Sequence, residues 1–441
     1  MNFRVITYSL AASIFAGCAS NASGGSAQQS AMLPAGSRQS SQYTVVELPP
    51  LGGSAAGADS INNLNWASGF SSLTSSSYLH AALWENGGSP VDLGTLGGPN
   101  SAVEWPVKND RGLISGISET AKKQRLGEVW SCAEAFFPQP PSGHICRGFA
   151  WRNGSMTALP TLGGNNGFAA GANERGEIVG WAETRKHDKT CVSPQVLQFE
   201  AAIWNAKDGR VEELPPMRGD KDGAATEIND RGQAVGISGI CDQAVGRFTA
   251  KHAVMWDHGQ IVNLGSLGGV AWNTPMAIND KGDVAGFSDL SGDQSGGPNF
   301  HAFLWTKSRG MTDLGTLPGD AYSEALGINE AGQIVGVSYG VSFSTSRAFI
   351  WQNGTMTDLN TLIPPSSQLY LLFANDINDQ GIIGGGACVL VSNSCGSEAP
   401  GFMATPGQGA ALRSHAGDAS ERPPSLPPMI QRLIRAHALM P

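Results

Sequence analysis

The sequence predicts an all-β protein, a closed β-propeller with seven four-stranded blades. Three observations lead to this fold class. One short phrase returns seven times in 441 residues, and its period of about 50 residues is that of stacked or radially arranged modules. Glycine is abundant (58 residues) and only 15% of the residues are charged, which fits short strands joined by many turns. The repeat region also lacks the sustained 3.6-residue apolar period that marks a helix.

The copies of the phrase keep a common phase along the chain. They align on a turn asparagine, which is Asn62, Asn109, Asn173, Asn229, Asn279, Asn329 or Asn378. A tryptophan in the third segment of the phrase follows in six copies, as Trp84, Trp151, Trp204, Trp256, Trp305 and Trp351. The seventh copy, residues 401–404, has no tryptophan.

Each copy predicts four strands separated by turns. The strands end at Ile-Asn, run through Val-x-Gly-x-Ser, run through Ala-Phe-x-Trp and run through Met-Thr-Asp-Leu. Asn279 and Gly282 hold the first and fourth positions of a type I turn. Asn65 replaces that glycine in the first copy, and asparagine is the residue that best tolerates a left-handed conformation. Asn153-Gly154 is a strong signal for a hairpin between the third and fourth strands.

The two ends of the repeat region indicate a closed ring. Residues 43–51 read as a fourth strand with no blade before them, and the last copy runs out at Pro406 after three strands. We therefore expect the N-terminal strand to complete the last blade, which removes an exposed sheet edge. An open solenoid is the alternative. Copies 2 and 7 match the phrase least well, so six or eight blades stay open as well.

The N-terminus predicts export. Residues 1–17 carry Arg4 and then an apolar run, and Ala16-Gly17-Cys18 resembles the site at which bacterial lipoprotein signals are cleaved and lipidated. We expect a signal peptide over 1–17 and a lipidated Cys18 that begins a tether over 18–42, poor in large apolar residues. An outer-membrane lipoprotein, or an extracellular or periplasmic protein, follows. The alternative is an ordinary secretory signal with a chance cysteine.

Six cysteines lie beyond Cys18, and an even number in an exported chain indicates disulfides. Pairs that are local along the chain are 132–146, 191–241 and 388–395, formed by Cys132, Cys146, Cys191, Cys241, Cys388 and Cys395. Six cysteines allow 15 pairings, so this connectivity rests on locality alone. No cysteine or histidine spacing typical of a metal site occurs, and we expect no cofactor.

Charge and hydropathy limit the partners. The net charge is −9, which argues against nucleic acid because phosphate binding needs a basic surface. No apolar stretch after the signal is long enough to span a bilayer, so the lipid at Cys18 is the expected membrane contact. We expect a monomer. Residues 407–441 predict a disordered tail, with a possible short basic helix from Pro428.

Three phased phrases resemble the HAF-repeat proteins, a largely uncharacterised group of bacterial extracellular repeat proteins. The phrases are His301-Ala302-Phe303, Asp313-Leu314-Gly315-Thr316-Leu317 and the Ile-Asn-x-x-Gly-x-Val-x-Gly-x-Ser copies. The resemblance covers about residues 43–406 and implies export and a repetitive β fold. It carries over no catalytic residue.

Two places are candidate ligand sites. The length variation is concentrated in the loops between second and third strands, such as 119–146, and insertions on one face of a repeat protein often form its binding face. That loop holds Trp130, Phe136 and Phe137, which either stack on a ligand or tuck against the blade.

The second candidate site is formed by acids on the inner strands. If they line the channel mouth, they suit a cation or acid–base chemistry: Asp59, Glu104, Glu227, Glu324 and Asp376.

These observations favour a non-enzymatic binding or scaffolding propeller that is tethered to the cell envelope. Its ligand, a protein or a glycan, would bind on the rim that carries the long loops. The alternative is a secreted polysaccharide hydrolase or lyase that uses acids at the central channel. Similarity of fold alone gives little support to either function, and the sequence does not predict the identity of the ligand.

Overall fold

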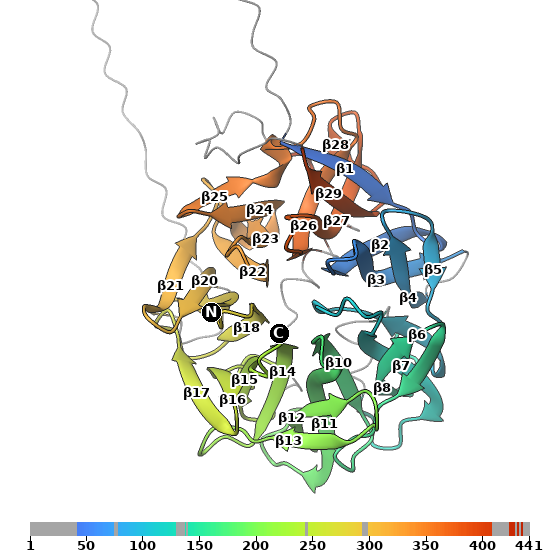
Figure 1. Ribbon diagram of the computed structural model, residues 1–441, viewed down its shortest axis with the longest axis vertical. Helices are drawn as coiled ribbons and strands as arrows, with labels where there is room; N and C mark the ends of the chain where they lie inside the picture. The colour runs from blue at the N-terminus through green and yellow to red at the C-terminus, as the bar shows by residue number, and fades with distance from the viewer. Residues whose placement is uncertain are drawn as a thin grey trace, which may run out of the picture. The chain divides into compact units, whose positions relative to one another are not determined.

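Each copy of the repeated phrase folds into one antiparallel sheet, and the computed structural model arranges the seven sheets in a ring (Figure 1). This confirms the predicted fold class. The structure describes residues 42–74, 78–128, 137, 140–242, 246–292, 299–407, 423–427, 430–431 and 434. All of them belong to one compact unit, Ser41–Pro441.

Blades 1 to 3 follow one another along the chain, and within each sheet the strands pair in sequence order. Blade 1 contains β2 (Gly52–Ile61), β3 (Trp66–Leu73), β4 (Leu79–Glu85) and β5 (Pro90–Asp92). Blade 2 contains β6 (Gly97–Ala102), β7 (Ile114–Lys123), β8 (His144–Arg152) and β9 (Ser155–Ala158). Blade 3 contains β10 (Gly167–Ala172), β11 (Glu177–His187), β12 (Leu197–Asn205) and β13 (Val211–Leu214).

Blades 4 to 6 repeat this order. Blade 4 contains β14 (Asp222–Ile228), β15 (Ala234–Gly239), β16 (His252–Asp257) and β17 (Gln260–Gly265). Blade 5 contains β18 (Thr274–Ile278), β19 (Val284–Asp289), β20 (Phe300–Thr306) and β21 (Gly310–Gly315). Blade 6 contains β22 (Tyr322–Ile328), β23 (Ile334–Tyr339), the 3-10 turn η2 (Val341–Phe343), β24 (Ser346–Gln352) and β25 (Thr355–Asp358), and η3 (Leu359–Thr361) follows it.

The last blade is completed by the first strand of the chain, as the sequence predicts. Blade 7 contains β26 (Leu369–Ile377), β27 (Ile383–Val391), the short β28 (Ser394–Cys395), β29 (Gly401–Pro406) and β1 (Tyr43–Leu48). β1 lies antiparallel to β29, with Tyr43 opposite Pro406 and Leu48 opposite Gly401 (Figure 1). β1 therefore covers the edge of β29 that would otherwise be free at the join.

The predicted turns have the expected backbone. Gly282 has φ +82° and Asn65, its counterpart in the first copy, has φ 61°. Asn153 and Gly154 both have positive φ (52° and 79°), as a two-residue hairpin turn requires. We call the face formed by the turns between first and second strands the turn face. The opposite face, which carries the loops between second and third strands, is the loop face.

The turn asparagines join all seven blades in one cycle. The Nδ2 group of each asparagine donates to the backbone carbonyl of the equivalent asparagine in the next blade, over 2.7–3.1 Å, and Asn378 returns to Asn62. The Oδ1 atom of each accepts the N–H of the residue four positions later in its own turn. One amide thus closes the turn and holds the neighbouring blade, which explains why the phrase repeats asparagine at this position.

Other residues of the phrase also serve contacts between successive segments. The serine that ends the second-strand motif accepts a backbone N–H from the connection before its blade in five copies, for example Ser338 from Leu317 at 3.1 Å. The indole of Trp84 donates to the carbonyl of Pro49 at 2.9 Å, with equivalent contacts at Trp204 and Trp256. His301 pairs with Asp313 at 3.0 Å, so two of the repeated phrases are linked through side chains.

Two of the predicted disulfides are present. Cys191–Cys241 links the long loops of blades 3 and 4, and Cys388–Cys395 closes the β27–β28 hairpin. Cys146 is buried, and its predicted partner Cys132 lies outside the described residues. Disulfides persist in oxidising compartments, so these bonds indicate an exported protein. Among the described residues, no helix is long and apolar enough to cross a membrane.

We predict that Asn279→Ala destabilises the protein by about 3 kcal/mol, because the change leaves buried backbone groups in two blades without partners. Asn279→Asp retains the acceptor within the turn and loses the donor to blade 6, so its loss is smaller, about 1–2 kcal/mol. Urea unfolding measures both. Equal losses for the two variants would contradict an interblade role for the Asn279 amide.

Candidate functional site: the acidic mouth of the channel

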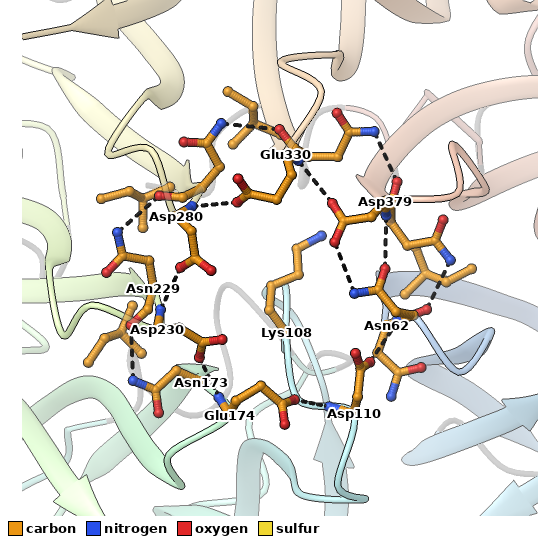
Figure 2. Close-up of a pocket in the computed structure, with 18 residues that line it drawn as sticks. Asn62, Lys108, Asp110, Asn173, Glu174, Asn229, Asp230, Asp280, Glu330 and Asp379 are labelled. Atoms are coloured by element: carbon orange, nitrogen blue, oxygen red, sulfur yellow. Dashed lines mark hydrogen bonds between the residues drawn. The ribbon is translucent and has the colours of Figure 1, made fainter.

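The channel opens on the turn face into a cavity of about 120 Å³ (Figure 2). Its wall includes Lys108, several turn asparagines and, in every copy, the residue that follows the turn asparagine. This residue is acidic in six blades and asparagine in blade 1: Asn63, Asp110, Glu174, Asp230, Asp280, Glu330 and Asp379. We call these seven residues the mouth ring.

The mouth ring forms a second closed cycle of hydrogen bonds. The backbone N–H of each member donates to a side-chain oxygen of the member in the next blade, for example Glu174 to Asp230 at 2.8 Å. The last bond runs from the N–H of Asp379 to Oδ1 of Asn63, at 2.9 Å. Figure 2 shows the side chains arranged around the axis, inside the asparagine cycle.

At Asn63 the mouth ring keeps its hydrogen bond but carries no negative charge. Its amide oxygen accepts the same backbone hydrogen bond that the carboxylates accept in the other blades. A neutral acceptor therefore satisfies this position. Six carboxylates around one small cavity repel one another, so the ring carries more negative charge than its hydrogen bonds require.

Neighbouring acids and burial raise the pKa of two members of the ring. For Asp230, burial comes first and the charge of Asp280 adds to it. For Glu330, burial is followed by the charges of Asp280 and Asp379. Cations stand outside the ring on blades 2 to 5, where Arg111 contacts Glu174 at 3.0 Å. The equivalent positions in blades 6, 7 and 1 are uncharged, namely Ala331, Gln380 and Leu64.

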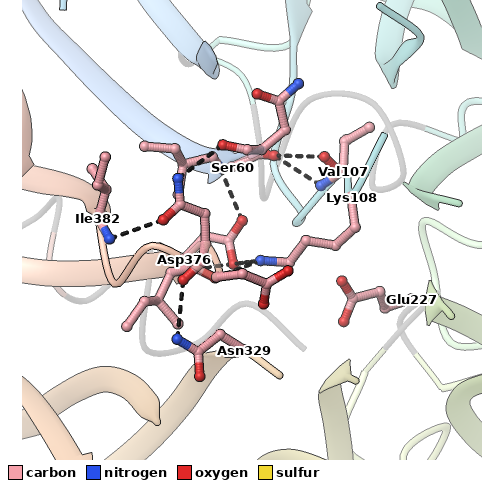
Figure 3. Close-up of polar contacts among 12 residues, drawn as sticks. Ser60, Val107, Lys108, Glu227, Asn329, Asp376 and Ile382 are labelled. Atoms are coloured by element: carbon pink, nitrogen blue, oxygen red, sulfur yellow. Dashed lines mark hydrogen bonds and ion pairs between the residues drawn. The ribbon is translucent and has the colours of Figure 1, made fainter. Parts of the chain in front are cut away.

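Below the ring, an ion pair crosses between blades 2 and 7 (Figure 3). The Lys108 ammonium lies 2.5 Å from Oδ1 of Asp376 and donates to the carbonyl of Ile377 at 2.8 Å. The other carboxylate oxygen of Asp376 accepts the Ile61 N–H at 2.9 Å. Asp376 is fully buried, and burial raises its pKa although Lys108 opposes the shift.

Glu227 of blade 4 faces this ion pair across the channel (Figure 3). Its Oε2 atom accepts the Ile278 N–H at 2.6 Å, while Oε1 is buried without a hydrogen-bond partner. Burial raises the pKa of Glu227 to about 8, with Lys108 acting against the shift and Asp376 adding to it. At neutral pH Glu227 is therefore mostly protonated and neutral, and it lies opposite the ion pair of Asp376 and Lys108.

Local backbone features place both acids. The pairing of β14 with β15 is irregular between Ala225 and Glu227, and that of β26 with β27 between Ala374 and Asp376, and such bulges redirect side chains. Glycine in the preceding blade makes room for each acid. A Cβ at Gly171 would lie 2.9 Å from the Cα of Glu227, and one at Gly327 would lie 2.8 Å from the Cα of Asp376.

The five acids predicted from the inner strands are divided among separate places. Glu227 and Asp376 lie beneath the mouth. Asp59 binds the Asn375 amide at 2.6 Å, and burial raises its pKa to about 8. Burial, followed by the charge of Asp59, raises the pKa of Glu104. Glu324 accepts the Tyr339 hydroxyl at 3.0 Å instead.

The aromatic residues predicted on the long loop of blade 2 contribute no exposed ring among the described residues. Phe137 is 5% exposed and packs in the apolar cluster at the loop face, which is the second of the two arrangements expected for it. Trp130 and Phe136 lie outside the described residues.

The mouth ring and Lys108 were missed by sequence reasoning, although the sequence holds a signal for each. An acid follows the turn asparagine in six of seven copies. Lys108 stands where five copies have isoleucine and one has Ala172. The acid after the asparagine was interpreted only as part of the turn. The lysine at position 108 made copy 2 a poor match to the phrase.

The cavity suits a small cation rather than a large organic ligand. Its volume of about 120 Å³ is well below the roughly 300–1,000 Å³ of small-molecule pockets. The described residues contain no group of three or more His, Cys, Asp or Glu side chains arranged to coordinate a metal ion. An ammonium or guanidinium group needs hydrogen-bond acceptors around it, and the carboxylates of the ring offer them.

No protein-family model and no curated protein sequence matches the chain. The class defined by the structure is a closed seven-bladed β-propeller. Solved propellers are similar over most of the chain. The β-propeller domain of the trilobed protease from Pyrococcus furiosus aligns over 84% of this chain and 98% of its own (TM-score 0.47, 6% identity).

An oligogalacturonate lyase from Vibrio parahaemolyticus aligns over 83% of this chain and 95% of its own, with a TM-score of 0.44 and 10% identity. TolB from Acinetobacter baumannii aligns over 83% and 80% (TM-score 0.38, 11% identity). These similarities concern the propeller architecture and carry no assignment of function.

Glu227 makes stability depend on pH. Its raised pKa of about 8 means that the folded chain keeps a proton that the unfolded chain loses near pH 4.3. This contribution is full below the unfolded pKa and is lost as the pH rises through about 8. We predict that the wild type loses on the order of 2–3 kcal/mol relative to Glu227→Gln between pH 5 and 8. Urea unfolding at each pH measures the difference. Parallel curves would contradict the assignment, and Glu212→Gln on an outer strand is the control.

Proposed function

We propose that this protein is an exported binding propeller that receives the basic tip of a lysine or arginine side chain of a partner protein in its acidic mouth. The mouth ring would surround the cationic group, because its six carboxylates outnumber Lys108, the one cation among the described residues that line the same cavity. The observation that carries the proposal is Asn63, because it shows that the hydrogen-bond cycle works without charge.

The size and burial of the mouth support the same ligand. A cavity of about 120 Å³ has room for about four waters or for the end of one side chain. Carboxylates that surround a partly desolvated cation bind it more strongly than in open water. Blades 6, 7 and 1 carry no cation two residues after the turn asparagine, which favours entry of the ligand over these blades.

This proposal moves the binding site from the rim of long loops to the opposite face. Residues near the C-terminus fill the channel end at the loop face, where Ile430 and Ile434 are 0% exposed. The turn face retains an open hollow. A partner that binds over this hollow would also contact the exposed turn residues around it, and that contact would supply affinity beyond the single cation.

Polysaccharide cleavage is the second candidate function. Glu227 and Asp376 have environments that separate their protonation states, which is the arrangement that acid and base pairs use. The mouth above them is smaller than small-molecule sites, and Asp376 is already paired with Lys108. Release of new reducing ends from a polysaccharide, lost in Glu227→Gln, would support this function over binding.

The binding test uses three blocked pentapeptides with lysine, arginine or norleucine between glycines, titrated calorimetrically at low salt. We predict binding of the two basic peptides and none of norleucine. Asp280→Asn with Asp379→Asn keeps the hydrogen-bond acceptors, as Asn63 does, and removes two charges worth about 1 kcal/mol each. We expect at least a tenfold loss of affinity in this variant. Asp208→Asn, on the exposed 3–4 turn of blade 3, is the matched control.

Two outcomes would overturn the binding proposal. In one, norleucine binds as well as lysine. In the other, the affinity is unchanged in the double variant and at 0.5 M salt, where exposed charge interactions are largely screened.

The proposal also includes the cellular location of the protein. The resemblance to lipoprotein signals at residues 16–18 and to the HAF-repeat group supports an outer-membrane protein held by a lipid on Cys18. We predict that Cys18→Ala moves the expressed protein from the membrane fraction to the soluble one. Cys395→Ala is the control for loss of a cysteine as such. A variant at Cys18 that stays with the membrane would contradict lipid anchoring.

A further inference from the structure

The loop-face end of the channel is apolar and contains residues near the C-terminus. One buried cluster there draws side chains from the first and second strands of blades 2 to 7, and the partly buried Ala55 and Phe70 of blade 1 pack against it. Leu426, Ile430 and Ile434 belong to this cluster, and both isoleucines are 0% exposed. Ile430 and Ile434 are helical and four residues apart, which places them on the same side of a helix, and Leu426 precedes the described helical residues.

The ring does not need this segment in order to close. β1 already completes the last blade by pairing with β29. The described contacts of the segment with the sheets are few: the Cys395 N–H donates to the Ser425 carbonyl at 3.1 Å, and the Ser425 hydroxyl donates to Ser394 at 2.8 Å. Both contacts are made to the hairpin that the Cys388–Cys395 disulfide closes.

The segment satisfies part of its own backbone. The Gln431 N–H donates to the Pro427 carbonyl at 3.0 Å, and the Gln431 side chain donates to the Leu426 carbonyl at 3.0 Å. Among the described residues of the segment, three aliphatic side chains therefore provide most of its attachment to the propeller. An apolar stripe of this kind is how amphipathic helices recognise grooves.

The cluster that contains those side chains is also rich in aromatic rings. Phe168 stacks on Trp181 at 4.3 Å, and Phe300 lies 5.6 Å from Tyr322. These aromatic residues belong to the same cluster as the three aliphatic ones or pack against it. Buried, well-packed aromatic groups are typical of the energetic centre of binding sites.

We propose that the loop-face end of the channel is a helix-binding socket whose occupant is the part of this chain near its C-terminus that carries Leu426, Ile430 and Ile434. The segment binds as an intramolecular ligand through Leu426, Ile430 and Ile434. A helix with aliphatic residues at the same spacing competes with it. This proposal concerns the opposite face from the acidic mouth and does not depend on cation binding there.

The test uses the full chain and a fluorescent peptide of residues 423–436. In the wild type the tethered segment competes at an effective concentration of about 1 mM, so the peptide binds weakly. Ile430→Asp with Ile434→Asp releases the segment and leaves the socket free. We expect the peptide to bind this variant about 100-fold more tightly than the wild type. A peptide that carries the same two aspartates is the control and does not bind.

Hydrogen exchange in the wild type provides the second measurement. A socket occupant opens locally, so the Gln431 amide exchanges at least 100-fold faster than the amides of β29, and its exchange accelerates when unlabelled peptide is added. Exchange of Gln431 only together with β29 would show an integral part of the core and overturn the proposal. A double variant that fails to fold, or one that folds and does not bind the peptide, overturns it as well.

Discussion

The cycle of asparagine side chains on the turn face is the interaction on which the rest of the molecule depends. Each amide has one acceptor and two donors, so the same group closes its own turn and holds the next blade, as Asn229 does between blades 4 and 5. Because the cycle returns from Asn378 to Asn62, every blade is fixed by both neighbours. Aspartate has no N–H to give, and serine is too short to reach both partners, which accounts for asparagine in all seven copies.

The backbone that this cycle fixes also positions the charges of the channel. The residue after each asparagine points its N–H at a side-chain oxygen of the next blade, so carboxylates are brought to one axis by the same register. Below them, the bulge in the first strand turns Glu227 and Asp376 into the channel. The packing of the blades thus brings the seven residues of the mouth ring together. Six of them are acidic, and Asn63 in blade 1 is neutral.

The sequence predicted the parts of this structure that follow from one copy of the phrase. The strands, the turn at Gly282 and the hairpin at Asn153-Gly154 are local, and the closure by residues 43–51 followed from counting strands. What the sequence did not predict depends on contacts between copies. Lys108 reaches a residue of blade 7 that is 268 positions away, and a single copy holds no sign of this. The burial of Ile430 was equally invisible, because the tail lies outside the repeat.

The two ends of the channel therefore differ in chemistry and in access. The loop-face end is lined by apolar side chains and filled by Leu426, Ile430 and Ile434, whereas the turn-face end is polar and open. A ligand of the mouth would therefore enter and leave on the turn face. Low polarity beneath the mouth raises the pKa of Glu227, and it also strengthens any hydrogen bond that Glu227 makes to a cation.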